Sequence, residues 1–235
     1  MSALVMEATG VVKDLGVGVA QIRALKGVDL ALKGGELTLL MGPSGSGKTT
    51  LLSILGCMLT PTEGTVRVRG DAIAGKNPED LAKLRRENIG FVFQSYHLFP
   101  TLSAADNVRL ALDVRGETGT DAKDKARAAL DRVGLSSKTR NYPSQLSGGE
   151  QQRVAIARAV VGDPSVILAD EPTAALDSEN GKAIMSILAA IAKDPGRGVL
   201  VVTHDPRLVP FADRIIHIED GSIVREEAGG AAQKS

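Results

Sequence analysis

The sequence predicts an α/β fold in which a mainly parallel sheet carries an inserted helical segment. Three observations predict it. Short apolar runs alternate with helical stretches along most of the chain, which is typical of parallel sheets covered on both faces. A glycine-rich loop at residues 42–50 joins one apolar run to a helical stretch. Between residues 95 and 161 the strand pattern stops and helical periodicity replaces it.

The strands are predicted from their apolar runs and the turns beside them. Buried strands are expected at the apolar runs of residues 36–41, 89–93, 166–170 and 198–203. Residues 64–69 alternate between apolar and polar and follow a turn, so they predict a half-exposed strand. Residues 214–227 contain two alternating runs around Asp220 and Gly221, which predicts a hairpin.

Helices predicted within the inserted segment define the domain organisation. They are expected at residues 104–116, 121–134 and 147–162. We therefore predict a single domain over residues 1–235, in which residues 1–94 and 162–227 form the core. Residues 95–161 form a helical subdomain, and residues 228–235 form a flexible tail because they are small and polar.

Composition and charge exclude several classes of protein. The chain is 43% hydrophobic and 24% charged, with 28 basic and 28 acidic residues, so no nucleic-acid partner is expected. Its single cysteine excludes an internal disulfide. The first residues show no signal peptide, and no apolar run approaches the ~20 residues that span a bilayer. We expect a cytoplasmic chain whose membrane spans, if it works at a membrane, come from another protein.

The glycine-rich loop predicts a phosphate site. Its residues 42–49, GPSGSGKT, match G-x-x-x-x-G-K-[ST] between a strand and a helix. Backbone N–H groups of such a loop, with the helix N-terminus, form an anion-binding nest. Lys48 would reach the β- and γ-phosphates, and the Thr49 hydroxyl would bind Mg²⁺. The alternative is a glycine-rich turn with a surface lysine. The nucleotide-binding residues predicted here are Gly42, Pro43, Ser44, Gly45, Ser46, Gly47, Lys48, Thr49 and Thr50.

Two acids end the apolar run VILADE. Asp170 is placed to hold Mg²⁺, directly or through water, and Glu171 to orient or deprotonate an attacking water. Adjacent carboxylates at the end of an apolar strand repel each other unless a cation lies close by. The alternative for Asp170 is an N-cap of the next helix.

A third motif opens a helix at LSGGE. Ser147 is a good N-cap residue, and the bare N–H groups of a helix start can bind an anion. Simple capping would explain Ser147 alone. It does not explain Gly148 and Gly149, which a close approach of the backbone to a phosphate would require.

Together these motifs resemble those of the ATP-binding subunits of ABC transporters. The resemblance runs from about residue 7 to 226 and includes, in the family's order, GPSGSGKT, the glutamine of FVFQ, LSGGE with QQRVAIARA, VILADE, PTAALD and the histidine of VVTHD. It implies a P-loop NTPase (RecA-like) core, an antiparallel β part on the N-terminal side and an inserted helical subdomain. It also implies ATP hydrolysis with Mg²⁺.

The resemblance assigns further roles by position. Two copies would face each other head to tail, with ATP between the phosphate loop of one copy and the signature residues Ser147, Gly148, Gly149 and Glu150 of the other. Gln94 would sense Mg²⁺ and the attacking water, His204 would contact the γ-phosphate, and Asp177 would cross to the second copy. Alone, His204 would be a polar residue ending a strand.

One position departs from the family. Family members usually stack an aromatic ring on adenine near the first strand, where this chain has Leu15, and no Phe, Tyr or Trp precedes Phe91. We hypothesise that Leu15 and the stem of Arg23 pack on the base and give only a weak preference for ATP over GTP.

Within the family the chain is most similar to the macrolide-exporter and lipoprotein-release (MacB/LolD-like, DevA-like) group. That similarity implies a peripheral position on the inner face of the cell membrane, a transmembrane permease contacting the region around Tyr96, Leu98 and Phe99, and room for a periplasmic adaptor. Local packing is the alternative for those three side chains. Rival functions are a non-exporting signalling or cell-division complex and a scaffold that binds ATP and barely hydrolyses it.

Overall fold

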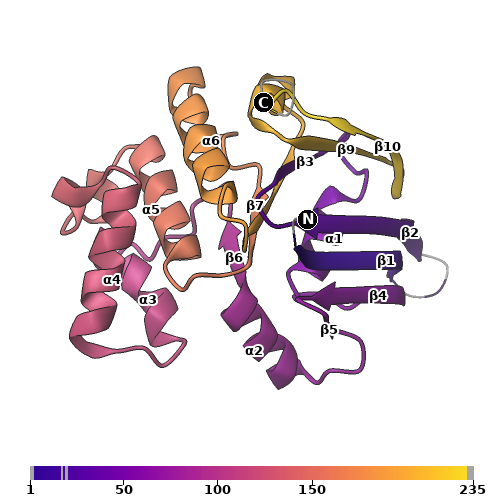
Figure 1. Cartoon of the computed structure of the whole chain (residues 1–235), viewed down its shortest axis with the longest axis horizontal. Helices are drawn as coiled ribbons and strands as arrows, with labels where there is room; N and C mark the ends of the chain where they lie inside the picture. Colours follow the sequence, from indigo (N-terminus) through magenta and orange to yellow (C-terminus); the bar gives the residue numbers. More distant parts are fainter. Residues whose placement is uncertain (1–2, 17, 19–20, 232–235) are drawn as a thin grey trace.

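The computed structural model describes residues 3–16, 18 and 21–231 and arranges them as two sheets and a set of helices (Figure 1). The antiparallel sheet has the order β2-β1-β4-β5. Its strands are β1 (Leu4–Leu15), β2 (Ile22–Lys33), β4 (Glu63–Val68) and β5 (Asp71–Ala72).

The second sheet has six strands in the order β10-β9-β3-β8-β7-β6. Five of them run parallel, and β10 closes the edge as an antiparallel hairpin partner of β9. Its strands are β3 (Leu37–Met41), β6 (Ile89–Val92), β7 (Val166–Asp170), β8 (Gly198–Thr203), β9 (Arg214–Glu219) and β10 (Ser222–Ala228). The predicted α/β class with a mainly parallel sheet and an antiparallel part is confirmed.

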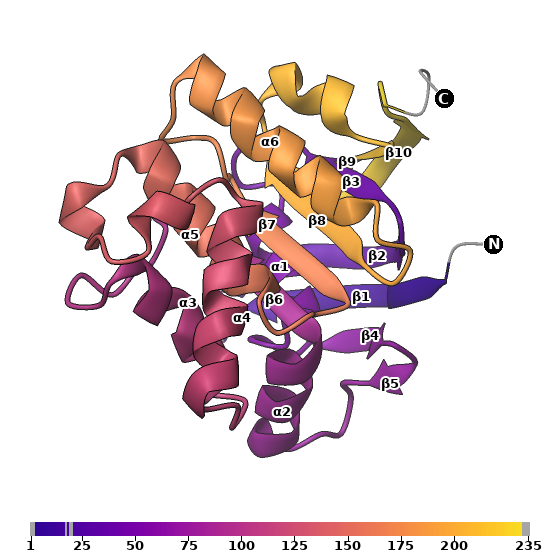
Figure 2. The same cartoon turned by 60° about the vertical axis from the view of Figure 1, so that its left-hand side comes forward.

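The helices divide into those that cover sheets and those that form a separate group. Figure 1 shows α3, α4 and α5 together beside the parallel sheet, away from β1, β2 and β4. Figure 2 shows α6 lying across the parallel strands. The helices are α1 (Lys48–Leu55), α2 (Pro78–Asn88), α3 (Ala104–Asp113), α4 (Gly119–Arg132), α5 (Gly148–Val160) and α6 (Ser178–Ala192), with short 3₁₀ turns η2 (Ser136–Lys138), η3 (Pro143–Gln145) and η4 (Pro206–Phe211). No helix in the described part of the chain is both long and apolar enough to cross a bilayer.

The parallel strands are apolar along their length because both faces are covered. Successive residues of a strand point to opposite faces. Leu40 and Leu200 pack with α1 and the antiparallel sheet, whereas Leu39 and Val201 pack with α6 and the helical group. Helix α1 therefore lies between the two sheets, which fixes the loop before it against the ends of the parallel strands.

The structure describes only residues 228–231 of the predicted flexible tail at residues 228–235, and these residues are hydrogen-bonded to the core. Ala228 pairs with Arg214 within the hairpin, and the Gly229 and Ala231 N–H groups donate to the carbonyls of Asp213 and Ala212. Polar composition gave no sign of these backbone bonds. Residues 232–235 lie outside the described part.

Candidate functional site

A cavity of ≈ 750 Å³ opens at the carboxyl edge of the parallel sheet. Ligands collect at this edge in open α/β sheets, and the volume is within the range of small-molecule sites. The loop before α1, the ends of β7 and β8, and the end of the β1–β2 hairpin at Leu15 and Ile22 all contribute. The site residues predicted from the sequence that line this cavity are Leu15, Arg23, Pro43, Ser44, Gly45, Gly47, Lys48, Thr49, Thr50, Gln94, Asp170, Glu171 and His204.

The loop at residues 42–47 delivers the start of α1 to this cavity without a side-chain cap. Helices α2, α3, α5 and α6 each have an N-cap side chain that accepts a hydrogen bond from the helix, whereas α1 has none. Its first N–H groups are therefore available to an anion, as a phosphate site requires. The cap residue Gly47 has a φ of 99°, and a Cβ there would lie 2.8 Å from the Ala24 carbonyl oxygen.

Gly42 and Ser46 shape the loop instead of lining the cavity. A Cβ on Gly42 would lie 2.1 Å from the Ile218 carbonyl oxygen, so only glycine fits against strand β9. Ser46 is buried, and its carbonyl accepts a hydrogen bond from the Gly221 N–H. The two residues hold the loop against the β9–β10 turn.

Lys48 lies across the mouth of the loop. Its Nζ donates to the carbonyl oxygens of Gly42 at 2.7 Å and Pro43 at 2.6 Å. Burial lowers the pKa of Lys48, and the charges of Glu171 and Asp170 oppose that shift. A partly buried ammonium held by neutral carbonyls is well suited to exchange them for anionic oxygens, since charge-assisted hydrogen bonds are the stronger ones.

Asp170 ends β7 near this lysine, and Glu171 directly follows the strand. Burial raises the pKa of Asp170, the charge of Glu171 raises it further, and Lys48 opposes the shift. A divalent cation would reverse this effect by favouring the charged carboxylate. The Thr49 hydroxyl and the Gln94 side chain line the same cavity and offer the hard oxygen ligands that Mg²⁺ prefers.

These residues fit Mg²⁺ that shares its ligands with a substrate. Within the described ranges no three His, Cys, Asp or Glu side chains cluster as a metal cage. Mg²⁺ commonly binds through one or two protein oxygens together with phosphate and water. Thr49, Gln94 and Asp170 therefore stand as the candidate ligands.

Glu171 is held in an unusual conformation. Its φ is 45°, in the left-handed region that non-glycine residues seldom adopt, and its N–H donates to the Val202 carbonyl. One carboxylate oxygen accepts from the Thr203 hydroxyl at 3.2 Å, and the other lies 2.6 Å from Nδ1 of His204. Strained backbone of this kind concentrates at functional sites. The carboxylate is thus aimed by the neighbouring strand β8.

The signature residues and Asp177 lie outside this cavity. Ser147 and Glu150 form a complete capping box at the start of α5, and Asp177 caps α6 by accepting from the Asn180 N–H. Hydrogen bonds that Asn180 donates to the Asp177 carboxylate lower the pKa of Asp177. A Cβ on Gly149 would lie 2.6 Å from the Asn180 side chain, and one on Gly148 would lie 2.8 Å from the Tyr96 hydroxyl. Capping and close packing therefore explain these residues within one copy.

Sequence reasoning missed several residues of the site. Thr203 directly precedes the predicted His204, and its hydroxyl type was a usable signal. Ile22 lines the cavity opposite Leu15, which the hairpin pairing with Leu15 could have indicated. Asp220 and Gly221 were assigned only to a turn, although that turn forms part of the cavity wall.

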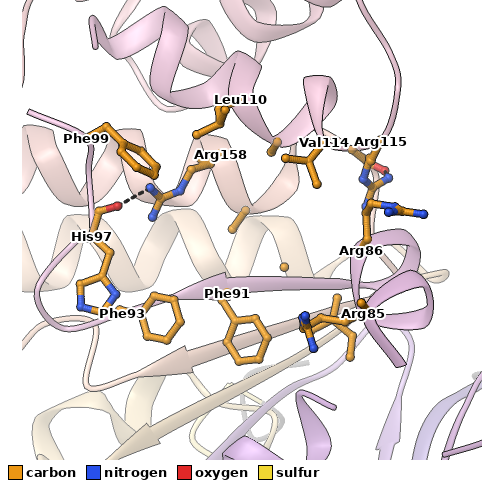
Figure 3. A pocket seen from close by; sticks show the side chains of 16 residues that line it. Arg85, Arg86, Phe91, Phe93, His97, Phe99, Leu110, Val114, Arg115 and Arg158 are labelled. Carbon is orange, nitrogen blue, oxygen red and sulfur yellow. Dashed lines mark hydrogen bonds between the residues drawn. The ribbon is translucent and has the colours of Figure 1, made fainter. Parts of the chain in front are cut away.

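A second cavity of ≈ 490 Å³ lies between α2, β6, α3 and α5 (Figure 3). Its floor carries Phe91 and Phe93, whose rings stack at 5.4 Å. Of the three side chains predicted to contact a permease, only Phe99 lines this groove, and it is exposed. Leu98 packs against the helical core, as the local-packing alternative expected. Four guanidinium groups surround the apolar floor, those of Arg85, Arg86, Arg115 and Arg158.

Arg158 connects this groove to the signature helix. From α5 it donates to the backbone carbonyl of His97 (Figure 3). It also donates to the backbone carbonyl of Tyr96 at 2.8 Å. Tyr96 and His97 both have positive φ, so the arginine holds a strained turn in place. Burial lowers the pKa of Arg158.

Comparison with known proteins identifies the family to which this chain belongs. The sequence model of a family described as ABC transporter matches residues 25–174, which is more than half of the chain. The chain belongs to the ABC transporter family. The match includes the phosphate loop, the signature motif and both acids of this ABC cassette.

Curated relatives of the ABC cassette are longer than the chain. It is 48% identical over 208 residues to the pyoverdine export ATP-binding/permease protein PvdT of Pseudomonas fluorescens, which covers 88% of this chain and 32% of that protein. It is 47% identical over 221 residues to the macrolide export ATP-binding/permease protein MacB of Acinetobacter baylyi, covering 94% of this chain and 33% of that protein. The chain spans about a third of the length of these relatives.

A solved structure matches the cassette over nearly its whole length. It is the dimeric ATP-binding cassette MJ0796 in a post-hydrolysis state, bound to ADP and Pi. The TM-score is 0.86 at 43% identity, and the match covers 95% of this chain and 98% of that one. The ABC cassette fold is therefore the fold of this chain.

Proposed function

We propose that this chain is the ATP-binding and ATP-hydrolysing subunit of a membrane export system of the MacB and PvdT type. The observation that carries the proposal is the meeting of an uncapped helix start, a half-buried lysine and two strand-end acids around one cavity. The similarity to the export proteins PvdT and MacB supports export as the use of the hydrolysis energy.

Binding would begin at the phosphates. The free N–H groups at the start of α1 and the Lys48 ammonium would receive the β- and γ-phosphate oxygens. Thr49, Gln94 and Asp170 would hold Mg²⁺, which supplies charge neutralisation of the phosphate oxygens when bound.

Hydrolysis would proceed by in-line attack of water on the γ-phosphorus. Glu171 orients the water and accepts its proton as the new P–O bond forms. The bond between the γ-phosphorus and the bridging oxygen breaks, and ADP and phosphate leave. Thr203 keeps the carboxylate in position, and His204 is placed to contact the γ-phosphate from its position beside Glu171. Lys48 and the backbone donors stabilise the developing charge.

A second copy would complete the site. Ser147, Gly148, Gly149 and Glu150 lie outside the cavity of their own copy, and so does Asp177. Head-to-tail pairing would bring the start of α5, with its helix-dipole charge, to the phosphates held by the other copy. The dimeric state of the structurally similar cassette MJ0796 supports this pairing. Loss of the γ-phosphate would then release the two halves.

The membrane partner would dock in the groove of Figure 3. We propose that a permease places a cytoplasmic segment against Phe99 and the surrounding surface, which locates the cassette on the inner face of the membrane. Arg158 would transmit movement of the permease to α5, because it joins that helix to the turn at Tyr96 and His97. A complete exporter of this type would also include a periplasmic adaptor. A non-exporting signalling or cell-division complex is the second candidate, because the same groove and cavity would serve it.

Phosphate release by wild type and Glu171→Gln tests the enzyme assignment. We expect the steady-state rate to fall by at least about 100-fold in the variant, the scale of a lost general base, while MgATP still binds. Glu226→Gln on strand β10 is the matched control and should keep the wild-type rate. Equal rates for wild type and Glu171→Gln would refute hydrolysis at this site and favour the scaffold alternative.

A further inference from the structure

The side chain of Asn180 lies at a junction between two segments that stay outside the nucleotide cavity. Asn180 belongs to the first turn of α6, which Asp177 caps, and Gly149 belongs to the first turn of α5. A Cβ on Gly149 would lie 2.6 Å from Oδ1 of Asn180 and 2.9 Å from its Cγ. The carboxamide of Asn180 therefore occupies the space that a side chain at residue 149 would need, and the two helix starts are in direct contact there.

The same carboxamide also binds the Asp177 carboxylate. Nδ2 of Asn180 donates to one carboxylate oxygen at 2.6 Å, and the Asn180 backbone N–H donates to the other at 2.9 Å. The backbone bond is an ordinary helix cap. The side-chain bond is not required for capping, and hydrogen bonds to charged groups are the stronger ones. Asn180 thus fixes the orientation of an exposed carboxylate while it touches α5 with its other end.

A second contact joins the same two segments. A Cβ on Gly148 would lie 3.4 Å from Cδ2 of Leu176, which directly precedes Asp177 and packs against buried side chains of the core. The Leu176 N–H donates to the Thr173 carbonyl at 3.0 Å, so the loop before α6 is itself tightly folded. Because the loop packs on the start of α5 at both contacts, movement of one segment must move the other.

We infer that Asn180 is a positioning residue that holds Asp177 and the start of α5 at one fixed spacing, so that a second copy meets both as a single surface. The inference rests on the proposed function, in which both segments reach the second copy, and it adds the residue that sets their spacing. An asparagine suits this position because its neutral amide donates to a carboxylate. An aspartate there would repel Asp177.

ATP-driven pairing of Asn180→Ala tests the inference. Sedimentation in a Glu171→Gln background with MgATP should show that the dimer dissociation constant rises at least about tenfold, since each dimer contains the junction twice and loses two hydrogen bonds to charged groups. The MgATP affinity of the monomer, measured at low protein concentration, should equal that of the parent because Asn180 lies outside the cavity lining.

Asn77→Ala is the matched control for this experiment. Asn77 accepts a hydrogen bond from the Asp80 N–H at the start of α2, so its loss also weakens a helix start but leaves the junction intact. This variant should pair like the parent. Equal pairing of Asn180→Ala and the parent would overturn the inference, as would a loss of pairing that Asn77→Ala shares or that comes with weaker MgATP binding. Failure of the parent itself to pair would overturn both the inference and the proposed two-copy site.

A double-mutant cycle tests the contact between Asn180 and Gly149. Gly149→Ala alone should melt below wild type without nucleotide, because its methyl group overlaps the carboxamide. Combined with Asn180→Ala, the same substitution should leave the melting temperature equal or higher, since alanine is the better helix former and the obstacle is gone. An equal loss from Gly149→Ala with and without Asn180 would refute the junction.

Discussion

At the scale of single residues, the site gathers charges that cost stability until a ligand compensates them. Lys48 and Asp170 both have pKa values displaced by burial in the direction that disfavours their charged forms. Each would gain from a phosphate or a divalent cation. Residues placed for function in this way are often destabilising for the free protein.

Asp170→Asn should therefore stabilise the ligand-free protein. We expect a rise in melting temperature of about 2–4 °C at neutral pH, the shift that about 1 kcal/mol gives in a chain of this size. A raised native pKa means that the penalty exists above that pKa and disappears as the pH falls toward the ordinary value of 3.8. The gain of Asp170→Asn should shrink in the same direction. Thermal melts across pH measure it, and MgATP should stabilise only wild type strongly.

Asp205→Asn is the control of opposite sign. Arg207 lowers the pKa of Asp205 through hydrogen bonds to its carboxylate, so this acid stabilises the fold above its ordinary pKa and loses that contribution as the pH falls. The variant should melt below wild type at neutral pH. A lower melting temperature in Asp170→Asn as well would contradict the stability cost assigned to Asp170.

Sequence reasoning reached the residues that motifs place next to one another along the chain. Lys48 and Thr49 follow from the loop, and Asp170 and Glu171 from the strand end. Thr203 could have been named as a candidate from its place before His204, but its contact with Glu171 could not be predicted, because that contact depends on β7 and β8 being neighbours in the sheet. Predicting Ile22 requires the register of the β1–β2 hairpin, and the sequence between these strands contains no standard two-residue turn signal.

At the scale of elements, helix α5 combines a structural cap with a proposed binding role. Ser147 accepts from the Glu150 N–H at 3.3 Å, and the Glu150 carboxylate accepts from the Ser147 N–H at 2.8 Å. These two bonds lower the number of free donors at the helix start, while the dipole of α5 still favours an anion there. Capping and phosphate binding can be separated by substitution.

Ser147→Asp should keep the cap and lose the binding. Asp caps helices as well as Ser does, so the melting temperature should stay near wild type. Its negative charge should prevent ATP-driven dimerisation by repelling the phosphates of the second copy. Ser147→Ala loses about 1 kcal/mol of capping and should melt lower. Both are measured in a Glu171→Gln background with MgATP. A fully dimeric Ser147→Asp protein would leave Ser147 as a cap alone.

Elements with a strong apolar pattern were predictable, and those with a weak one were not. Strands β3 and β7 are buried on both faces and therefore stand out in the sequence. Helix α2 was missed because it is strongly polar and buries only Leu84, although Asn77 and Pro78 form a recognisable helix start. Strand β5 has two residues, too few to show a period.

At the scale of the whole molecule, the proposed function gives each copy half of two sites. The cavity holds the phosphate loop and both acids, and the signature residues lie elsewhere on the surface. A chain built in this way is expected to be a monomer in dilute solution and to pair when triphosphate occupies the cavity.

Sedimentation of Glu171→Gln tests the pairing. With MgATP we expect a dimer, because the γ-phosphate persists when the water is not activated. Without nucleotide, or with Lys48→Ala added, the protein should sediment as a monomer. A monomer alone at saturating MgATP would contradict the two-copy site.

The bonds from Arg158 to the turn at Tyr96 and His97 link the groove to helix α5, which begins with the signature residues. Residues 147 and 158 are separated by about 16 Å of one helix at 1.5 Å per residue, with no glycine or proline from residue 150 onward. Linkage is reciprocal, so an occupant of the arginine-rimmed groove that changes the affinity for a triphosphate must have its own affinity changed by the same factor. Binding of a triphosphate would then change the affinity of the groove for its membrane partner as much as the partner changes the affinity for the triphosphate.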